Sequence, residues 1–303
     1  MTGDGLWRPA SGCGPGCLPA AHAPDVSLPR RVGRLLGVLG MLSAGVGLAA
    51  LLPLLPARDR RAALRGWARG TLRALGVRLA VRGRLPRPPA LLVANHVSWL
   101  DILALLAVAP ARMLAKREVR DWPVLGPLAA AAGTVFVDRS RPRDLPGTVG
   151  RVAGALRAGH SVAVFPEGTT WCGVAAGCRP GRGFRPAVFQ AAVDTGAPVV
   201  PLRLAYRYAG DTSTLPAFLG EETLWASVRR VLGARDLSVA VTVAAALHPA
   251  AGADRRMLAR AAESAVHPSP VRTPVRPAAT GVRIVRPVAP ARVAAEAELD
   301  LAA

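Results

Sequence analysis

Short apolar runs alternate with longer helix-forming runs over residues 77–266, and this alternation limits the folds open to the chain. The runs with strand character are 77–81, 90–94, 112–115, 134–137, 161–165, 199–205 and 238–244, and those with helix character are 99–108, 123–131, 146–158, 185–194, 222–232 and 255–266. Strands separated by helices favour parallel pairing, with helices covering both faces of the sheet. We therefore expect an α/β domain over residues 76–266, built on a mostly parallel central sheet of about seven strands covered by helices.

The residues on either side of this domain differ from it in composition. Residues 1–29 are rich in Gly, Pro and Ala without any period, and Pro, Arg and Ala dominate residues 267–303. Such segments cannot bury enough apolar surface to offset the entropy lost on folding. We therefore expect a disordered head and a disordered tail.

Between the head and the domain, residues 30–75 have the signature of a membrane-anchoring helical segment. Residues 35–57 contain no charged side chain and are long enough to cross a bilayer. Arginines stand on both sides of this run, whereas a single crossing favours a bias toward one side. A hairpin or in-plane anchor on the cytoplasmic face of the cell membrane fits at least as well as a crossing, and a buried core helix is the third interpretation.

The net charge of +20 favours polyanionic partners such as a phospholipid surface. Residues 58–75 have the pattern of an amphipathic helix, with Arg61, Arg65, Arg69 and Arg73 at four-residue steps where like charges repel. Anionic lipid headgroups would relieve that repulsion, and a merely solvated face is the alternative. Aromatic residues are only 4% of the chain and do not interleave with basic ones, so we expect no nucleic acid partner.

The chain has four cysteines, at Cys13, Cys17, Cys172 and Cys178. Neither of the two spacings matches a common zinc pair, and no pair of histidines accompanies them. The expectation is therefore thiols in a reducing cytoplasm, with no bound metal.

The sequence NHVSWLD, residues 95–101, joins an apolar strand to an apolar helix. Loops at the carboxyl ends of strands line the clefts of α/β folds, so this junction can carry reactive groups. Ser98 is a candidate N-cap with Asp101 completing a capping box, and His96 would then be an ordinary loop residue. The same cap also places Asp101 where its carboxylate can accept from one imidazole nitrogen of His96 and leave the other nitrogen as a base.

Three further polar motifs interrupt the apolar runs: GTVFVDR (133–139), FPEGTT (165–170) and APVVP (197–201). Arg139 ends a strand and its planar guanidinium suits a phosphate, although an ion pair with Asp138 is the structural alternative. Glu167 and the amides of Gly168 and Thr169 could orient the same acceptor. The chain has no Gly-Lys-Ser/Thr phosphate loop, dinucleotide fingerprint or Gly-x-Ser-x-Gly elbow. A histidine base without an obvious protein nucleophile indicates activation of a hydroxyl group on the substrate.

In this order, the motifs resemble those of the lysophospholipid acyltransferase family, also called the 1-acylglycerol-3-phosphate acyltransferases. NHVSWLD is similar to the family's first block, VFVDR to the second, FPEGT to the third and VVP to the fourth, over residues 77–243. The resemblance implies a fold like that of glycerol-3-phosphate acyltransferase. Two positions depart from the family pattern: Trp171 follows FPEGTT, and FRPA (184–187) stands where the family often has Phe-Lys-x-Gly. The second departure leaves the identity of the acceptor open.

The resemblance implies transfer of a fatty acyl group from acyl-CoA or acyl-carrier protein to the sn-2 hydroxyl of lysophosphatidic acid, giving phosphatidic acid without a cofactor. It makes His96 the base and Asp101 its orienting partner. It assigns the acceptor to Arg139, Glu167, Gly168, Thr169 and Lys116. Another lysolipid, such as lyso-ornithine lipid, is the alternative acceptor, and a catalytically inactive membrane-surface scaffold is the alternative outside enzymes.

Overall fold

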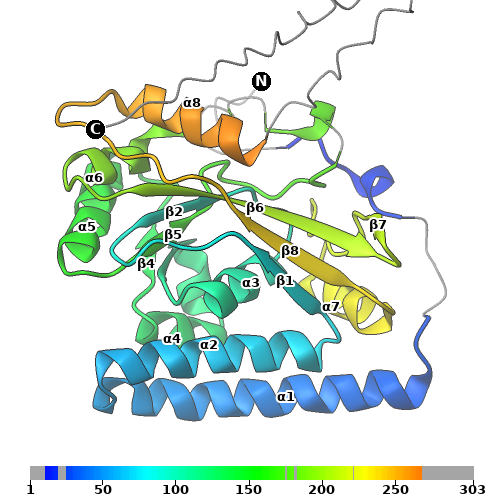
Figure 1. Ribbon diagram of the computed structural model, residues 1–303. Coiled ribbons are helices and arrows are strands. Elements are labelled where there is room, and N and C mark those ends of the chain that lie inside the picture. Colours follow the sequence, from blue (N-terminus) through cyan, green and yellow to red (C-terminus); the bar gives the residue numbers. More distant parts are fainter. Residues whose placement is uncertain (1–10, 20–24, 175, 181–182, 221, 268–303) are drawn as a thin grey trace, which may run out of the picture. The chain divides into compact units, whose positions relative to one another are not determined.

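The computed structural model describes residues 11–19, 25–174, 176–180, 183–220 and 222–267. Its strands are β1 (Arg78–Arg82), β2 (Leu91–Ala94), β3 (Arg112–Lys116), β4 (Val135–Val137), β5 (Val162–Val164), β6 (Val199–Tyr208), β7 (Asp211–Thr212) and β8 (Ser238–Val243). They form one sheet in the order β1-β8-β6-β2-β5-β3-β4, with β7 paired to β6 (Figure 1). Neighbouring strands are parallel except where β6 meets β8 and β7. The predicted α/β fold with a mostly parallel sheet is confirmed.

The helices are α1 (Leu28–Leu51), α2 (Ala57–Ala74), α3 (Leu100–Val108), α4 (Leu125–Ala131), α5 (Leu145–Arg157), α6 (Phe189–Val193), α7 (Leu224–Gly233) and α8 (Arg255–Val266). Helices α5, α6 and α8 pack on one face of the sheet, and α2, α3 and α7 pack on the other. Strand β2 lies between these layers: Leu91 and Val93 enter one core, and Leu92 and Ala94 enter the other. Burial on both faces explains why the central strands are apolar throughout rather than alternating.

Helices α1 and α2 form a tightly packed pair, and glycines make the close approach possible (Figure 1). A methyl group on Gly45 would stand 2.8 Å from the Trp67 indole nitrogen, and one on Gly70 would stand 2.8 Å from the end of Met41. The Trp67 Nε1–H also donates to the Met41 carbonyl oxygen at 2.7 Å. Gly45 of α1 and Gly70 of α2 therefore serve helix contact, as small residues do in membrane-embedded helix pairs.

Helix α2 also belongs to the core of the domain. Ala68 and Leu72, in its second half, and Leu75, just after its end, are at most 1% exposed and pack in the same cluster as α3. Helix α1 is tied on as well, because Arg34 Nη1 donates to the backbone oxygens of Leu232 and Ala234 at 3.0 and 2.7 Å. The segment 30–75 is thus one layer of the fold.

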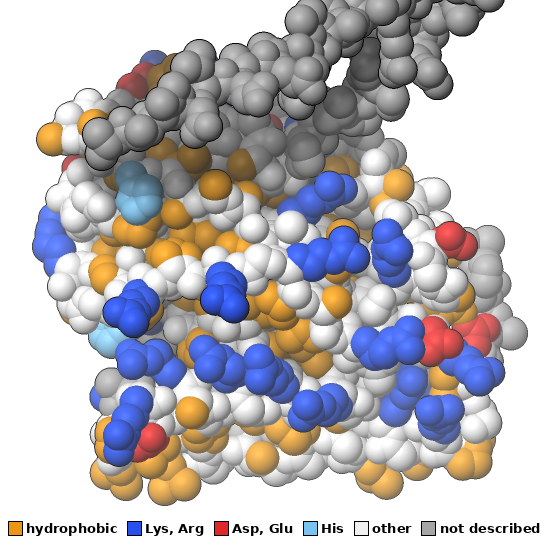
Figure 2. Space-filling model, viewed as in Figure 1, with side chains coloured by type: hydrophobic (Ala, Val, Ile, Leu, Met, Phe, Trp, Pro, Cys, Tyr) orange, Lys and Arg blue, Asp and Glu red, His pale blue; other side chains and the backbone are white. Residues whose placement is uncertain are grey.

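The outer side of α1 is apolar and exposed. Among the described residues, the stretch Leu28–Leu54 is the one helix long and apolar enough to cross a membrane, and only 11% of its most apolar window is buried. Figure 2 shows apolar side chains along the edge formed by α1, with arginines gathered in a band above it. A helix with one side packed on the domain and the other side apolar fits an in-plane anchor.

Four details differ from the sequence expectations. The predicted disordered head, 1–29, contains the 3-10 turn Pro15–Cys17 and the start of α1 at Leu28, while its residues 1–10 and 20–24 lie outside the described residues. The predicted helix 185–194 is a 3-10 turn, Pro186–Val188, followed by the short α6, because Pro186 suits a first turn and supplies no donor. Strand β7 has only two residues and left no hydrophobic pattern to read. His267, assigned to the tail, is packed at the end of α8, with its side chain 10% exposed. The rest of the predicted tail, 268–303, lies outside the described residues.

Candidate active site

The candidate site lies at the edge of the sheet where parallel strands end. His96 follows β2, Glu167 follows β5, Lys116 ends β3 and Arg139 follows β4. These four strands are neighbours and run in one direction, so their carboxyl ends meet at the same edge. This edge is where open α/β sheets hold their ligands.

His96 and Asp101 form the pair that the sequence predicted. The Nδ1 atom of His96 lies 2.8 Å from Asp101 Oδ2, and the histidine side chain is 20% exposed while the aspartate is fully buried. A carboxylate on Nδ1 fixes the tautomer with the lone pair on Nε2. Within the described part of the chain, no side chain or backbone group bonds to that Nε2. The ring also stacks on Phe165, with centroids 3.9 Å apart and planes 8° apart.

Asp101 holds the loop as well as the imidazole. Its Oδ2 accepts from the backbone amides of Val97 and Ser98 at 2.6 and 2.8 Å. The predicted role of Ser98 is only partly found: its Oγ accepts from the Leu100 amide at 3.3 Å, but α3 begins at Leu100 and its N-cap position is Trp99. The carboxylate, more than the serine hydroxyl, satisfies the amides of this turn.

Sequence reasoning missed Tyr206, which lies on β6 beside the pair. Its hydroxyl donates to Asp101 Oδ1 at 2.5 Å, and the residue is 3% exposed. Burial first, then the Asp101 charge and the hydrogen bond to it, raises the pKa of Tyr206 well above its usual value. The Tyr206 hydroxyl therefore stays protonated at physiological pH and donates its hydrogen bond to Asp101. A tyrosine in a strand gives no signal in the sequence that separates it from a packing residue.

Asn95 had no assigned role, although it belongs to the first motif. Its side chain forms two hydrogen bonds with the backbone of Leu204. Asn95 Nδ2 donates to the Leu204 carbonyl oxygen at 2.9 Å, and the Leu204 backbone amide donates to Asn95 Oδ1 at 2.8 Å. This pair joins the end of β2 to β6, where Tyr206 also lies. The asparagine therefore fixes the start of the loop relative to the strand that carries Tyr206.

Glu167 is 1% exposed, and partners from the protein occupy both carboxylate oxygens. Its Oε2 accepts from the His96 backbone amide at 2.7 Å. Its Oε1 accepts from Trp171 Nε1 at 3.0 Å and lies 2.9 Å from His267 Nε2. This arrangement differs from the predicted contact with an acceptor, because the carboxylate faces the protein interior. Trp171, the first departure from the family pattern, takes part in it.

Arg139 is exposed at the same edge, and its Nη1 donates to the Gly168 carbonyl oxygen at 2.6 Å. Partial burial of the guanidinium is the main cause that lowers the pKa of Arg139, while Glu118 raises it and Arg185 lowers it. Arg139 therefore senses the opposite charge of Glu118 more strongly than the like charge of Arg185. Asp138, the alternative partner of Arg139, instead accepts from Ser140 and Arg117.

Thr169 and Lys116, the other two predicted side chains, form few contacts with the rest of the site. Thr169 follows Gly168, whose backbone has a φ of +78°, and its hydroxyl lies 3.5 Å from the Thr170 carbonyl oxygen. Lys116 is exposed at the end of β3, paired in register with Val137 of β4. Both lie at the correct edge of the sheet.

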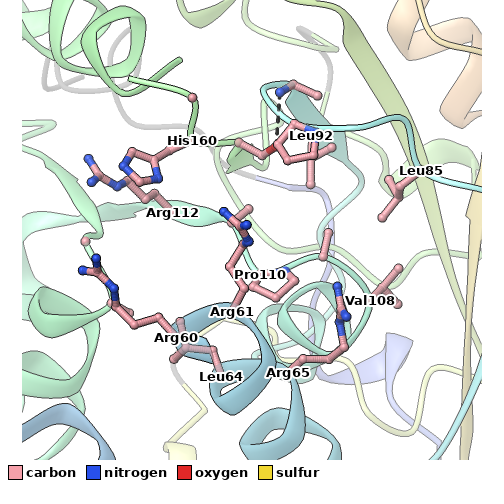
Figure 3. A pocket seen from close by; sticks show the side chains of 18 of the residues that line it. Arg60, Arg61, Leu64, Arg65, Leu85, Leu92, Val108, Pro110, Arg112 and His160 are labelled. Carbon is pink, nitrogen blue, oxygen red and sulfur yellow. Dashed lines mark hydrogen bonds between the residues drawn. The ribbon is translucent and has the colours of Figure 1, made fainter. Parts of the chain in front are cut away.

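A second basic feature lies at the opposite edge, at the amino ends of β2, β3 and β5. A cavity of about 460 Å³ is lined there by Arg60, Arg61 and Arg65 of α2 together with Arg112 and His160. Figure 3 shows Arg60 and Arg61 rising from α2 on the side of the cavity that holds Arg112 and His160, with Arg65 on the other side beside Val108. Burial and then the charges of Arg112, Arg60 and Arg61 lower the pKa of His160. Part of the predicted arginine stripe thus faces a common concave surface.

Comparison with known proteins gives consistent results. A family model described as Acyltransferase matches residues 78–205. The lyso-ornithine lipid O-acyltransferase of Pseudomonas aeruginosa is 37% identical over 236 residues, which cover 76% of this chain and 89% of that protein. The 1-acyl-sn-glycerol-3-phosphate acyltransferase of Neisseria meningitidis is 38% identical over 196 residues, which cover 63% and 73%. The structure of the 1-acyl-sn-glycerophosphate (LPA) acyltransferase PlsC of Thermotoga maritima has the same fold, with a TM-score of 0.54 at 21% identity over 78% of this chain and 94% of that chain.

Proposed function

This chain belongs to the acyltransferase family, and on that premise we propose that it transfers a fatty acyl group to the sn-2 hydroxyl of lysophosphatidic acid. The acyl donor is acyl-CoA or acyl-carrier protein, and the product is phosphatidic acid. The observation that carries the proposal is the buried Asp101 held 2.8 Å from His96 Nδ1, with Nε2 left for a substrate.

His96 Nε2 takes the proton of the acceptor hydroxyl as that oxygen attacks the thioester carbonyl carbon. The tetrahedral intermediate then collapses, the carbon–sulfur bond breaks, and the leaving thiolate takes the proton from the imidazolium. Asp101 stabilises the imidazolium without accepting its proton, as carboxylates do in comparable triads. Tyr206 holds that carboxylate from its other oxygen.

Glu167 is a positioning residue in this proposal. Its carboxylate fixes the backbone amide of His96 and the side chain of Trp171, and Trp171 in turn donates its own amide to the His96 carbonyl oxygen at 3.0 Å. The peptide groups on both sides of His96 are therefore restrained. A base must lie within hydrogen-bond reach of its proton, so this restraint acts on the rate.

Arg139 binds the acceptor phosphate, with Lys116 and the backbone near Gly168 and Thr169 beside it. The planar, exposed guanidinium of Arg139 at the carboxyl end of β4 suits a phosphate. The relative in Pseudomonas aeruginosa, named for lyso-ornithine lipid, makes that lysolipid the second candidate acceptor. The exposed guanidinium of Arg139 is the reason to place lysophosphatidic acid first.

The chain lies on the cytoplasmic face of the cell membrane in this proposal. The exposed apolar side of α1 enters the lipid, and the arginines of α2 lie at the level of anionic headgroups. Both the lysolipid and its product stay in the bilayer, so an in-plane anchor keeps the site beside its substrates. The fold of 30–75 onto the domain supports this arrangement over a single crossing.

The decisive assay uses purified protein, a labelled acyl-CoA and a panel of lysolipids, with product identification. We expect His96→Ala to lower turnover by about 10²–10⁴, the usual worth of a general base, while the thermal unfolding midpoint is retained. We expect Arg139→Ala to raise the KM for lysophosphatidic acid with a smaller effect on kcat. Full turnover in the His96 variant would exclude this residue as the base, and preference for another lysolipid would change the acceptor alone.

A further inference from the structure

The four cysteines of the chain meet at one point, although they come from two distant segments. Cys13 and Cys17 lie in the N-terminal segment, around the 3-10 turn Pro15–Cys17. Cys172 and Cys178 lie in the loop that follows FPEGTT, with Cys178 ending the 3-10 turn Ala176–Cys178. All four lie in the described part of the chain and are present as thiols. The fold therefore brings together two cysteine pairs that lie far apart in the sequence.

The four sulfur atoms have the spacing of a single tetrahedral ion. All lie within 4.8 Å of one another, and the sulfurs of Cys17 and Cys178 are 3.7 Å apart. A zinc ion with zinc–sulfur distances of about 2.3 Å sets its ligands on a tetrahedron with edges of about 3.8 Å. The irons of a cluster would spread four thiolates further apart than one ion does. Contrary to the expectation from the sequence, the Cys13–Cys17 spacing of three intervening residues does lie in the range of paired zinc ligands.

The surroundings suit bound thiolates in a closed site. The Cys172 backbone amide donates to Cys13 Sγ at 3.1 Å, which is the kind of bond that stabilises charge on sulfur. Cys172 is buried and the other three are partly buried against the core cluster that contains α3. The backbone at Gly12 lies against the backbone of Gly177 and Cys178, where a methyl group would stand 3.4 Å from the Gly177 oxygen.

We propose that Cys13, Cys17, Cys172 and Cys178 bind one structural zinc ion. This reverses the sequence expectation of no metal, which rested on spacing along the chain. The ion clamps the N-terminal segment to the loop 171–178. The inference stands whether or not the proposed acyl transfer is correct, because it rests on the sulfur geometry alone.

The proposed zinc site lies next to the loop that carries His96. Trp171, next to Cys172, donates its amide to the His96 carbonyl oxygen at 3.0 Å. Gly173, on the other side, has a φ of +79° and leaves so little room that a methyl group would stand 2.8 Å from Val97. Zinc bound at Cys172 therefore restrains the segment that supports His96, without touching any substrate. The zinc ion therefore has a positioning role for the loop that carries His96.

The first test measures metal in the full chain, purified in detergent under reducing conditions and without a histidine tag. We expect about one zinc per chain by elemental analysis. A strong chelator should remove it and lower the thermal unfolding midpoint, and added zinc should restore that midpoint. Replacement by Co²⁺ should give the intense visible bands of a tetrahedral thiolate site, which report the ligand set in the wild-type chain directly. None of these readouts requires acyl transfer.

The second test compares Cys17→Ser with Val174→Ala, a change in the same loop at an exposed residue that is not a ligand. We expect the serine variant to lose zinc and the cobalt bands, and the alanine variant to keep both. The proposal is overturned by a wild-type chain that binds neither zinc nor cobalt, or by disulfide bonds among these cysteines in protein taken from reducing cytoplasm. Iron in place of zinc would overturn the assignment of the ion.

Discussion

At the scale of single residues, Asp101 has two tasks that depend on different oxygens. Oδ2 accepts from His96 and from two backbone amides of the loop, whereas Oδ1 accepts only from Tyr206 among the described residues. A carboxylate held from both sides has one orientation, and so does the imidazole bonded to it. The orientation of the base therefore depends on a tyrosine whose hydroxyl bonds to Asp101.

This dependence can be tested with Tyr206→Phe. Loss of a hydrogen bond to a charged group costs about 1.5–3 kcal/mol, so we expect kcat to fall about 10- to 100-fold if the bond acts mainly in the transition state. The KM for the acceptor should change little, because Tyr206 lies behind Asp101. Tyr208→Phe, a change on the same strand, is the matched control. Steady-state kinetics that show equal losses in both variants, or a rise in KM alone, would contradict this role.

How far the sequence predicts the site depends on the distance between partners. The His96–Asp101 pair could be predicted because five residues at a strand–helix junction leave few geometries. Arg139 and Gly168 could be placed at one sheet edge, because parallel strands end together. The contacts of Tyr206 and His267 could not, since they join residues 105 and 100 positions apart in the sequence. The contacts of Glu167 with the His96 amide and with His267 could not be predicted for the same reason.

At the scale of elements, the contact between α1 and α2 depends on residues without side chains. Gly45 is buried against Trp67, and the indole is itself held by its bond to the Met41 carbonyl oxygen. The ring therefore cannot move aside without losing that hydrogen bond. The glycines of this run do not interrupt the helix, because α1 continues through them from Leu28 to Leu51.

Two alanine substitutions on the same helix separate contact from propensity. Gly45→Ala places a methyl group 2.8 Å from the indole, so we expect a loss of about 1–3 kcal/mol, the usual cost of overpacking. Gly47→Ala meets nothing within 4 Å and should be neutral or stabilise by about 0.5–1 kcal/mol through helix propensity. Thermal unfolding in detergent measures both. Equal midpoints for the two variants would rule out the close contact.

The arginines of α2 give a second element-scale prediction. Arg60 and Arg61 are exposed and line the basic cavity, so together they should attract anionic headgroups by about 1 kcal/mol each. We expect the double change to Gln to weaken binding to anionic vesicles about 10- to 30-fold, and to matter little at high salt. Arg207→Gln with Arg235→Gln, both exposed elsewhere, is the control. If both double variants co-sediment equally with anionic vesicles, the α2 arginines face solvent and do not bind headgroups.

At the scale of the whole molecule, the predicted anchor segment, 30–75, packs into the core of the acyltransferase domain. Removal of residues 1–75 would uncover the contacts of Ala68, Leu72 and Leu75 with the core, so such a truncation tests folding as much as membrane binding. The sequence could show that residues 35–57 are apolar, but not which side of the helix would meet the protein. That information lies in the bonds from Arg34 and Trp67, which form only in the folded chain.

The exposed side of α1 therefore offers a cleaner test in the full chain. Leu36, Leu39 and Leu51 are 62%, 50% and 55% exposed, so changing all three to Gln leaves the core intact. Each buried leucine is worth about 1.5–3 kcal/mol of transfer, and we expect membrane partitioning to fall by more than about 100-fold, with the protein appearing in the soluble fraction. Changing Leu145, Val174 and Met257 to Gln, which are exposed on other parts of the domain, should leave partitioning unchanged. Retention of the triple leucine variant in membranes, with its unfolding midpoint unaltered, would exclude this face as the anchor, because nothing else in the variant has changed.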